Sequence, residues 1–121
     1  ARAADAPIPV RADQVGQPTW SRDLADRIVA AVGVDAMPGI YHASNTGQAT
    51  RADQCRAIME LLGYDPALVV DAPPAEPVAG RARRPAYSVL GQNRWAEVRL
   101  RPLRHWREAL DAAVSDGLFS L

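Results

Sequence analysis

The sequence contains no lysine, and all 14 of its basic residues are arginine. Sites that need a lysine amine are therefore excluded from this chain, among them Schiff bases, P-loops and the Tyr/Lys pair of hydride-transferring dehydrogenases. The single cysteine, Cys55, rules out an internal disulfide and indicates a reducing, cytoplasmic setting. No apolar run approaches the roughly 20 residues of a membrane-spanning helix, and the first residues lack the apolar core of a signal peptide.

An excess of either charge is also missing, since 14 acidic residues balance the 14 arginines. Without a basic surplus, neither general nucleic-acid binding nor attachment to an anionic membrane surface is expected. The hydrophobic content of 48% is that of a globular chain rather than a disordered one, and a length of 121 residues predicts one domain.

Three short segments have the β-branched and aromatic content of strands: residues 8–12, 39–43 and 68–70. Pro9 would restrict the first to an edge or to the start of a strand, because proline cannot donate to the ladder. So few strands are not enough for an independent sheet with helices on both faces. We therefore expect a piece of a larger fold.

Three amphipathic patterns predict helices. The first is capped by Ser21 and ends at Gly33, the second is capped by Thr50, and the third has Pro102 in its first turn and ends at Gly117. Because strands and helices alternate, the sequence predicts an α/β or α+β fold. The expected apolar faces are Leu24, Ile28, Ala31 and Val32; Ala52, Cys55, Ile58, Met59 and Leu62; and Leu103, Trp106, Leu110, Ala113 and Val114.

Residue types that bind metals are scattered. His42, Cys55 and His105 are far apart, with no C-x-x-C or H-x-x-x-H spacing, so no metal site is expected. We expect His42 to be a strand histidine that hydrogen-bonds to the backbone and His105 to lie on a helix surface. Cys55 is expected to act as a small apolar residue on a helix face. The sequence also has no G-x-G-x-x-G or G-x-x-x-x-G-K phosphate loop and no G-x-S-x-G nucleophile turn.

Two polar clusters remain as candidate binding sites. In residues 13–20, Gly16 permits close approach of the backbone, and the helix that follows offers free N–H groups. This pattern fits both a helix-entry turn and a ligand-binding loop. The second cluster gathers Arg81, Arg83 and Arg84 in a proline-stiffened segment, which suits either bidentate contact with a diphosphate or a solvated linker.

The motif D-Q-x-G-x-P-T-W at residues 13–20, followed by Asp23-Leu24-Ala25, resembles the C-terminal half of dTDP-4-dehydrorhamnose reductases, which are extended short-chain dehydrogenases. The resemblance spans essentially the whole chain and depends on five motifs in the correct order. The later motifs are Gly39-Ile40-Tyr41-His42 with the polar turn after it, the helix through Ile58, Arg84-Pro85 with Ser88 and Leu90, and Leu103 with Trp106-Arg107-Glu108-Ala109-Leu110.

The resemblance implies an α/β fold: the C-terminal substrate-binding portion of an extended short-chain dehydrogenase, with the NAD(P)-binding Rossmann core largely missing. Family members reduce the C4 keto group of a dTDP-activated 6-deoxysugar with NADPH, which gives dTDP-L-rhamnose. Their N-terminal Rossmann domain carries the glycine-rich loop and the Tyr-x-x-x-Lys pair, both absent here. We therefore expect residues 1–121 to form a substrate-binding domain fragment that is inactive alone.

Within this fragment, the resemblance implies that residues 1–20 hold a sheet strand and a loop at the sugar-nucleotide cleft, and that residues 71–88 form an extended linker. Arg84 would contact the diphosphate, with Arg83 as a helper. Thr19 would offer a hydroxyl, Gln14 an amide, and Trp20 either an aromatic wall or ordinary packing. The expected substrate-binding residues are Gln14, Gly16, Pro18, Thr19, Trp20, Arg83 and Arg84.

Some family members form dimers bridged by a metal ion such as Mg²⁺ through glutamates, one of them in the helix after this loop. Arg22 stands at the nearest position here, so neither the metal nor the dimer is implied. The expected partner is a dTDP-sugar, with no nucleic acid and no membrane. A strand at residues 8–12 without its family neighbours would expose an unpaired edge and apolar surface, so the isolated chain is expected to self-associate or to be marginally stable.

Three alternatives stay open on sequence alone. The full protein could be a non-catalytic regulatory or binding subunit of the same fold, a 4-ketoreductase for another dTDP-deoxyhexose, or a self-standing interaction domain. An intact Tyr-x-x-x-Lys pair elsewhere in the protein would favour the enzyme.

Overall fold

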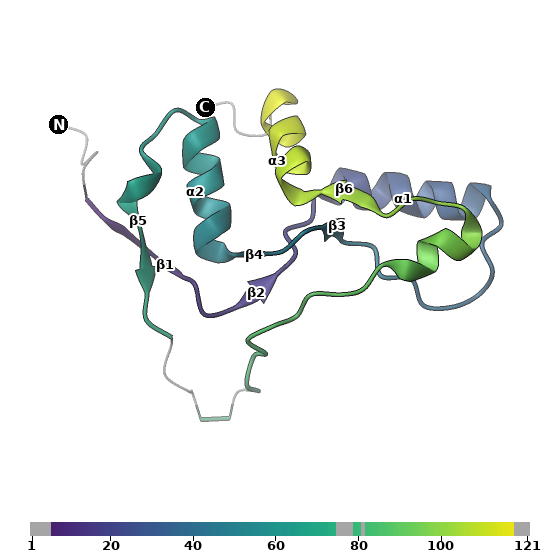
Figure 1. The fold of residues 1–121 in the computed structure, drawn as a ribbon, viewed down its shortest axis with the longest axis horizontal. Helices are drawn as coiled ribbons and strands as arrows, with labels where there is room; N and C mark the ends of the chain where they lie inside the picture. Colours follow the sequence, from purple (N-terminus) through teal and green to yellow (C-terminus); the bar gives the residue numbers. More distant parts are fainter. Residues whose placement is uncertain (1–5, 75–78, 81, 118–121) are drawn as a thin grey trace. The chain divides into compact units, whose positions relative to one another are not determined.

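The computed structural model describes residues 6–74, 79–80 and 82–117, which hold three α-helices, two short 3₁₀ helices and six short strands (Figure 1). They belong to two compact units. The first consists of Ala1–Gly16 and Ala49–Ser88, and the second of Gln17–Gln48 and Val89–Leu121. Arg81, one of the arginines singled out above, lies outside the described residues.

A parallel strand pair organises the first unit. β1 (Ile8–Arg11) pairs with β5 (Val69–Ala72), which follows the 3₁₀ helix η1 (Pro66–Leu68). Helix α2 (Arg51–Leu61) packs beside both strands, where its buried Ala52 and Ala57 allow close approach (Figure 1). The two expected strands at residues 8–12 and 68–70 thus form within a residue or two of the predicted bounds, and each finds its partner in the other.

The start of α2 confirms the predicted cap. The Thr50 hydroxyl accepts a hydrogen bond from the Asp53 N–H (3.0 Å), while the Asp53 carboxylate accepts one from the Thr50 N–H (2.9 Å). These bonds from the Thr50 backbone and hydroxyl lower the pKa of Asp53. Just upstream, β4 (Ala49–Thr50) pairs antiparallel with β2 (Val15–Gly16), a short strand that the sequence pattern presented as a turn.

The second unit is built around another parallel pair, β3 (Asn45–Thr46) with β6 (Leu103–His105). Helices α1 (Ser21–Gly33) and α3 (Trp106–Ser115) and the 3₁₀ helix η2 (Asn93–Val98) complete it. Its buried side chains are those of Asn45, Gln92, Trp95, Leu103, Trp106, Ala109 and Ala113.

The strand predicted at residues 39–43 is wrong, because this segment pairs with no other strand and Ile40 is 78% exposed. Hydrogen bonds that involve side chains stand in place of the backbone hydrogen bonds of a strand. Trp95 Nε1 donates to the His42 carbonyl (2.8 Å), and His42 Nδ1 lies 2.9 Å from the Gly91 carbonyl. The expectation that His42 is satisfied by backbone is therefore confirmed, although not on a strand.

Two predicted helix starts are also wrong. Ser21 is the first helical residue of α1, and the N-cap is Trp20, whose side chain makes no capping bond. Pro102 precedes β6, and α3 is capped by His105, whose Nδ1 accepts from the Arg107 N–H (3.2 Å). The His105 ring also lies where a Cβ on Gly47 would stand, and Gly47 has a φ of 82°, so only glycine fits there.

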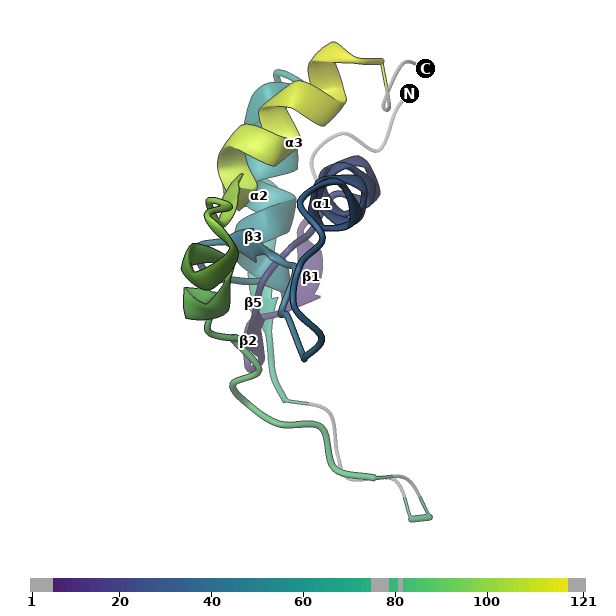
Figure 2. The same cartoon turned by 90° about the vertical axis from the view of Figure 1, so that its right-hand side faces the viewer.

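Helix α1, seen nearly end-on in Figure 2, buries none of its residues in the second unit. Ile28 and Val32 on its predicted core face are 55% and 77% exposed, and so are Val29 at 71% and, beyond the helix, Met37 and Ile40. An exposed apolar surface of this kind marks a contact surface or promotes association.

We expect Val32→Glu to reduce self-association of the isolated chain, because a carboxylate would interrupt this apolar face. The measurement is sedimentation equilibrium over a range of protein concentrations. Ala67→Glu adds the same charge at an exposed position of η1 and is the matched control. If both variants change the association constant equally, net charge rather than the α1 face governs it.

Candidate functional site

The two polar clusters seen in the sequence meet in the first unit. Val15 in β2 pairs with Thr50 on one side and forms a parallel bridge with Tyr87 on the other. Its N–H donates to the Ala86 carbonyl (2.8 Å), and the Ser88 N–H donates back to the Val15 carbonyl (2.9 Å). The D-Q-x-G motif therefore lies directly beside the chain that follows Arg84-Pro85.

Gly16 makes this approach possible without strain. A Cβ at that position would lie 3.3 Å from Ser88 Oγ, which itself donates to the Val15 carbonyl (3.2 Å). A larger residue would require the Ser88 hydroxyl to shift by a few tenths of an ångström. The close approach of a ligand to the Gly16 backbone stays a prediction.

The acidic residue of the same motif is already paired. Arg11 Nε and Nη2 donate to the two carboxylate oxygens of Asp13 at 2.9 and 2.6 Å, and this contact lowers the pKa of Asp13. Gln14, the next residue, is half-buried at the turn into β2. The motif thus carries a neutralised carboxylate rather than a negative charge that would repel an anion.

Arg83 and Arg84 lie on an exposed, extended part of the chain between residues 82 and 88. None of the ion pairs formed among the described residues includes either of them. The segment adjoining β2 thus carries two exposed arginines, a residue type that can bind phosphate oxygens bidentately.

Within the second unit, the Gln17 side chain acts like a strand partner. Its Oε1 accepts from the Leu90 N–H (2.8 Å) and from Ser44 Oγ (2.9 Å), and its Nε2 donates to the Leu90 carbonyl (3.4 Å). Gln92 Nε2 in turn donates to the Ser44 carbonyl (2.6 Å). Gln17 is not among the predicted site residues, although its amide stands within the motif.

An open groove of about 720 Å³ lies next to Gln17 in the second unit. Its walls carry no charged side chain, and amides from Gln17, Gln92 and Asn93 alternate with Leu90 and other apolar residues. Such a lining suits an uncharged polar group, such as a sugar or base, better than a diphosphate.

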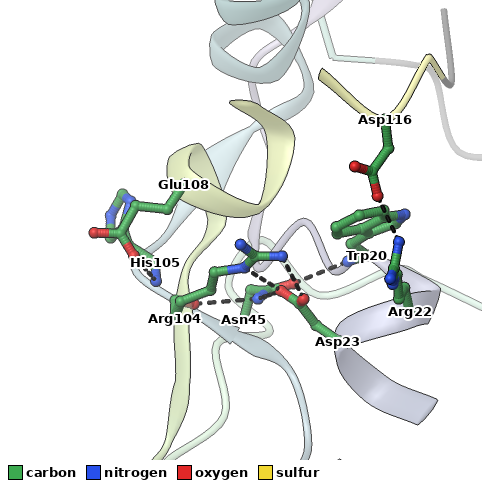
Figure 3. Close-up of polar contacts among 8 residues, drawn as sticks. All are labelled: Trp20, Arg22, Asp23, Asn45, Arg104, His105, Glu108 and Asp116. Atoms are coloured by element: carbon green, nitrogen blue, oxygen red, sulfur yellow. Dashed lines mark hydrogen bonds and ion pairs between the residues drawn. The ribbon is translucent and has the colours of Figure 1, made fainter. Parts of the chain in front are cut away.

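The loop before α1 is tied to a buried asparagine (Figure 3). Thr19 Oγ1 accepts from the Asn45 N–H (3.2 Å) and donates to the Gln17 carbonyl (3.0 Å), and Asn45 Oδ1 accepts from the Trp20 N–H (2.9 Å). Asn45 is 0% exposed. The Thr19 hydroxyl was expected to face a ligand. In the structure it makes two hydrogen bonds within the second unit, to Gln17 and Asn45.

The NH₂ group of the Asn45 side chain lies against the Asp23–Arg104 ion pair. Its Nδ2 donates to Asp23 Oδ2 (2.7 Å) and to the Arg104 carbonyl (3.1 Å). Arg104 Nε and Nη2 donate to both oxygens of Asp23 at 2.9 and 2.7 Å (Figure 3). The Arg104 guanidinium, with the Asn45 amide beside it, holds the pKa of Asp23 below its ordinary value.

The Trp20 ring lies close to two cations. The guanidinium carbons of Arg104 and Arg22 lie over it, at 5.4 and 5.7 Å from the ring centroid. Arg22 is also paired with Asp116 (Figure 3). The position at which some family members carry a glutamate metal ligand is thus occupied by a cation that already has a carboxylate partner.

Metal-binding, membrane-spanning and dinucleotide-binding features were also sought. Over the described ranges, no three metal-binding side chains gather in one place, and every helix is too short or too polar to cross a lipid bilayer. NADPH does not fit this chain: the sheets seen in the described part are two-stranded, and the sequence has neither a lysine nor a glycine-rich phosphate loop.

Comparison with known proteins places these observations in a family. The profile described as "RmlD substrate binding domain" matches residues 2–118. A probable dTDP-4,6-dihydroxy-2-methyloxan-3-one 4-ketoreductase from Streptomyces antibioticus is 48% identical, over 92% of this chain and 37% of that protein. A dTDP-4-dehydrorhamnose reductase from Mycolicibacterium smegmatis is 45% identical, over 93% of this chain and 34% of that protein.

Solved structures agree with the sequence relatives. A dTDP-4-dehydrorhamnose reductase from Bacillus anthracis, crystallised in complex with NADP, has a TM-score of 0.76 at 26% identity, covering 92% of this chain and 38% of that one. A second such reductase, from Clostridium acetobutylicum, has a TM-score of 0.77 at 28% identity, covering 98% of this chain and 41% of that one. The chain thus has the expected α/β fold and spans little more than a third of the length of its relatives.

We expect Asp23→Asn to destabilise the protein at about pH 7 by roughly 1 to 2 kcal/mol, because hydrogen bonds to a charged partner are lost. Since the folded-state pKa of Asp23 is below its ordinary value of 3.8, the wild-type advantage is complete above that pH and disappears as the pH falls through the folded pKa. The measurement is the urea midpoint at a series of pH values.

Asp111→Asn is the control for Asp23→Asn, since it removes an exposed carboxylate in the middle of α3. Its urea midpoint should differ little from that of the wild type at any pH. Equal pH profiles for the two variants would show that the Asp23–Arg104 pair contributes no stability.

Proposed function

Because the chain belongs to the RmlD substrate binding domain family, we propose that it supplies the nucleotide-sugar-binding part of an NADPH-dependent dTDP-4-dehydrorhamnose reductase. The reaction reduces the C4 keto group of the dTDP-sugar and yields dTDP-L-rhamnose. Two relatives carry this enzyme's name at 45% and 50% identity. This chain's part in the reaction is to bind and orient the nucleotide sugar.

The observation that carries the proposal is the pairing of β2 with the chain after Arg84-Pro85. It holds an exposed guanidinium pair beside a motif whose carboxylate is neutralised by Arg11. In the proposal Arg84 binds the diphosphate bidentately, Arg83 adds a second positive charge, and Gly16 keeps the backbone close. Gln14 offers its amide to the ligand.

Pro18, Thr19 and Trp20 lie in the second unit, and for these residues too we propose a part in ligand binding. Pro18 stiffens the loop, and the exposed Thr19 faces the ligand with the oxygen lone pair that its two hydrogen bonds leave free. Trp20 offers an aromatic edge, although its contacts with Arg22 and Arg104 also support a packing role. The uncharged groove beside Gln17, taken within the second unit, suits an uncharged polar ligand group.

NADPH belongs, in this proposal, to a part of the protein that this chain does not include. The residues present do not fit a dinucleotide, and the chain spans 37% or less of its curated relatives. The catalytic acid and the hydride donor are therefore assigned elsewhere, and no catalytic residue is assigned here.

A second candidate keeps the enzyme class and changes the sugar. The relative from Streptomyces antibioticus and a dTDP-4-keto-6-deoxy-D-glucose reductase from Streptomyces niveus, 46% identical, are named as ketoreductases of other dTDP-deoxysugars. Parallel assays of the full-length protein with each keto sugar separate the two candidates. A non-catalytic binding subunit would bind dTDP and oxidise no NADPH with any of them.

We expect the chain of residues 1–121 to oxidise no NADPH with dTDP-4-dehydro-L-rhamnose, because it lacks the lysine and the phosphate loop of the family's cofactor site. The measurement is NADPH absorbance, with the full-length polypeptide as the positive control. Turnover by the isolated chain would contradict the division of roles.

Arg84→Ala in the full-length polypeptide should raise KM for the nucleotide sugar by roughly tenfold to a hundredfold, because one charge-assisted contact contributes about 1.5 to 3 kcal/mol. Steady-state kinetics measure the effect. Arg101→Ala removes the same charge from an exposed position in the second unit and should leave KM unchanged. A KM for Arg84→Ala equal to that of the control would remove Arg84 from the site.

A further inference from the structure

We propose that Asn45 is a positioning residue for nucleotide-sugar binding: from inside the second unit it holds the Thr19–Trp20 backbone in the binding shape. The inference depends on the proposed function, which places these two loop residues at the ligand. Asn45 itself touches no ligand, since it is 0% exposed. It acts only through what it holds.

Asn45 makes hydrogen bonds to two consecutive residues of the loop, Thr19 and Trp20. Its backbone N–H donates to Thr19 Oγ1, and its side-chain Oδ1 accepts from the Trp20 N–H. Trp20 is the N-cap of α1, and its indole makes no capping bond. In an ordinary capping box, the side chain of the third helical residue accepts a hydrogen bond from the N-cap N–H. Here Asn45 Oδ1 accepts that hydrogen bond instead.

A second step is that the amide has only one satisfactory orientation. Its NH₂ group faces two acceptors, Asp23 Oδ2 and the Arg104 carbonyl, while its oxygen faces a donor on Trp20. Turning the amide over would set oxygen against oxygen and N–H against N–H at every contact. Two hydrogen bonds from Arg104 fix the position of the Asp23 carboxylate. The acceptor of the Asn45 NH₂ group is therefore itself held in place.

The final step connects this rigidity to binding. A buried polar side chain is costly unless all its partners are in place, and when they are, it specifies one arrangement of the groups around it. Here the groups around it are the backbone of the loop and the first turn of α1. A shift of about 1 Å in a binding group can cost a hundredfold in rate or affinity, so losing the amide should weaken substrate binding.

The test compares two variants of the full-length polypeptide. Asn45→Ala should raise KM for the dTDP-keto sugar by about tenfold and leave kcat within about twofold, because it misplaces binding groups and no catalytic group. Ala113→Gly lowers stability at a buried position of α3 in the same unit, and Ala113 takes part in none of the hydrogen bonds of Asn45. Assayed well below both melting temperatures, it should keep the wild-type KM. Equal KM shifts in both variants would overturn the inference.

A milder variant keeps the inference testable if Asn45→Ala does not fold. Arg104→Met releases Asp23 and also removes the guanidinium that lies over the Trp20 ring, and because the Arg104 side chain is already 38% exposed, the fold should survive. KM should rise about threefold, whereas the exposed control Arg101→Met should not change it. No difference between these two variants would also overturn the inference.

Binding of dTDP, measured by calorimetry, separates this inference from the proposed function. Wild-type protein that binds dTDP without turnover would disprove the reductase activity, and weaker dTDP binding by Asn45→Ala would then still support the positioning role. Wild-type protein with neither dTDP binding nor turnover would overturn both.

Discussion

A single buried amide joins parts of the second unit that are far apart in the sequence. Asn45 in β3 contacts Thr19 and Trp20 before α1, Asp23 within α1, and the Arg104 carbonyl in β6. The parallel pairing of β3 with β6 covers only a few residues, so the amide supplies order that the short ladder cannot. The start of α1 and the shape of the preceding loop both depend on it.

The parts of the fold that the sequence predicted correctly are those encoded by neighbouring residues. The Thr50–Asp53 cap is such a case, since donor and acceptor stand three residues apart. The strand expected at residues 39–43 failed because aromatic and β-branched content indicates an extended segment, not a partner for it. That segment is held by the indole N–H of Trp95, more than 50 positions away in the sequence.

The site divides in the same way. Gly16 and Arg84 were predicted as site residues because their residue types in a motif suggest a ligand, and the structure adds the contact between Val15 and Tyr87 that brings their segments together. Asn45 and Gln17 gave no such signal. An asparagine in a polar turn has the pattern of a solvated residue, and only the tertiary structure shows that all its partners are internal.

The glycine after β3 restricts how sequences of this kind can diverge. Gly47 has a left-handed backbone, and the His105 ring that caps α3 fills the space in which any side chain would begin. Replacing the histidine first would remove the overlap but leave α3 without its cap, and a new residue at position 47 would still be strained. Neither substitution is neutral as a first step, so the two positions should change together in evolution or stay as they are.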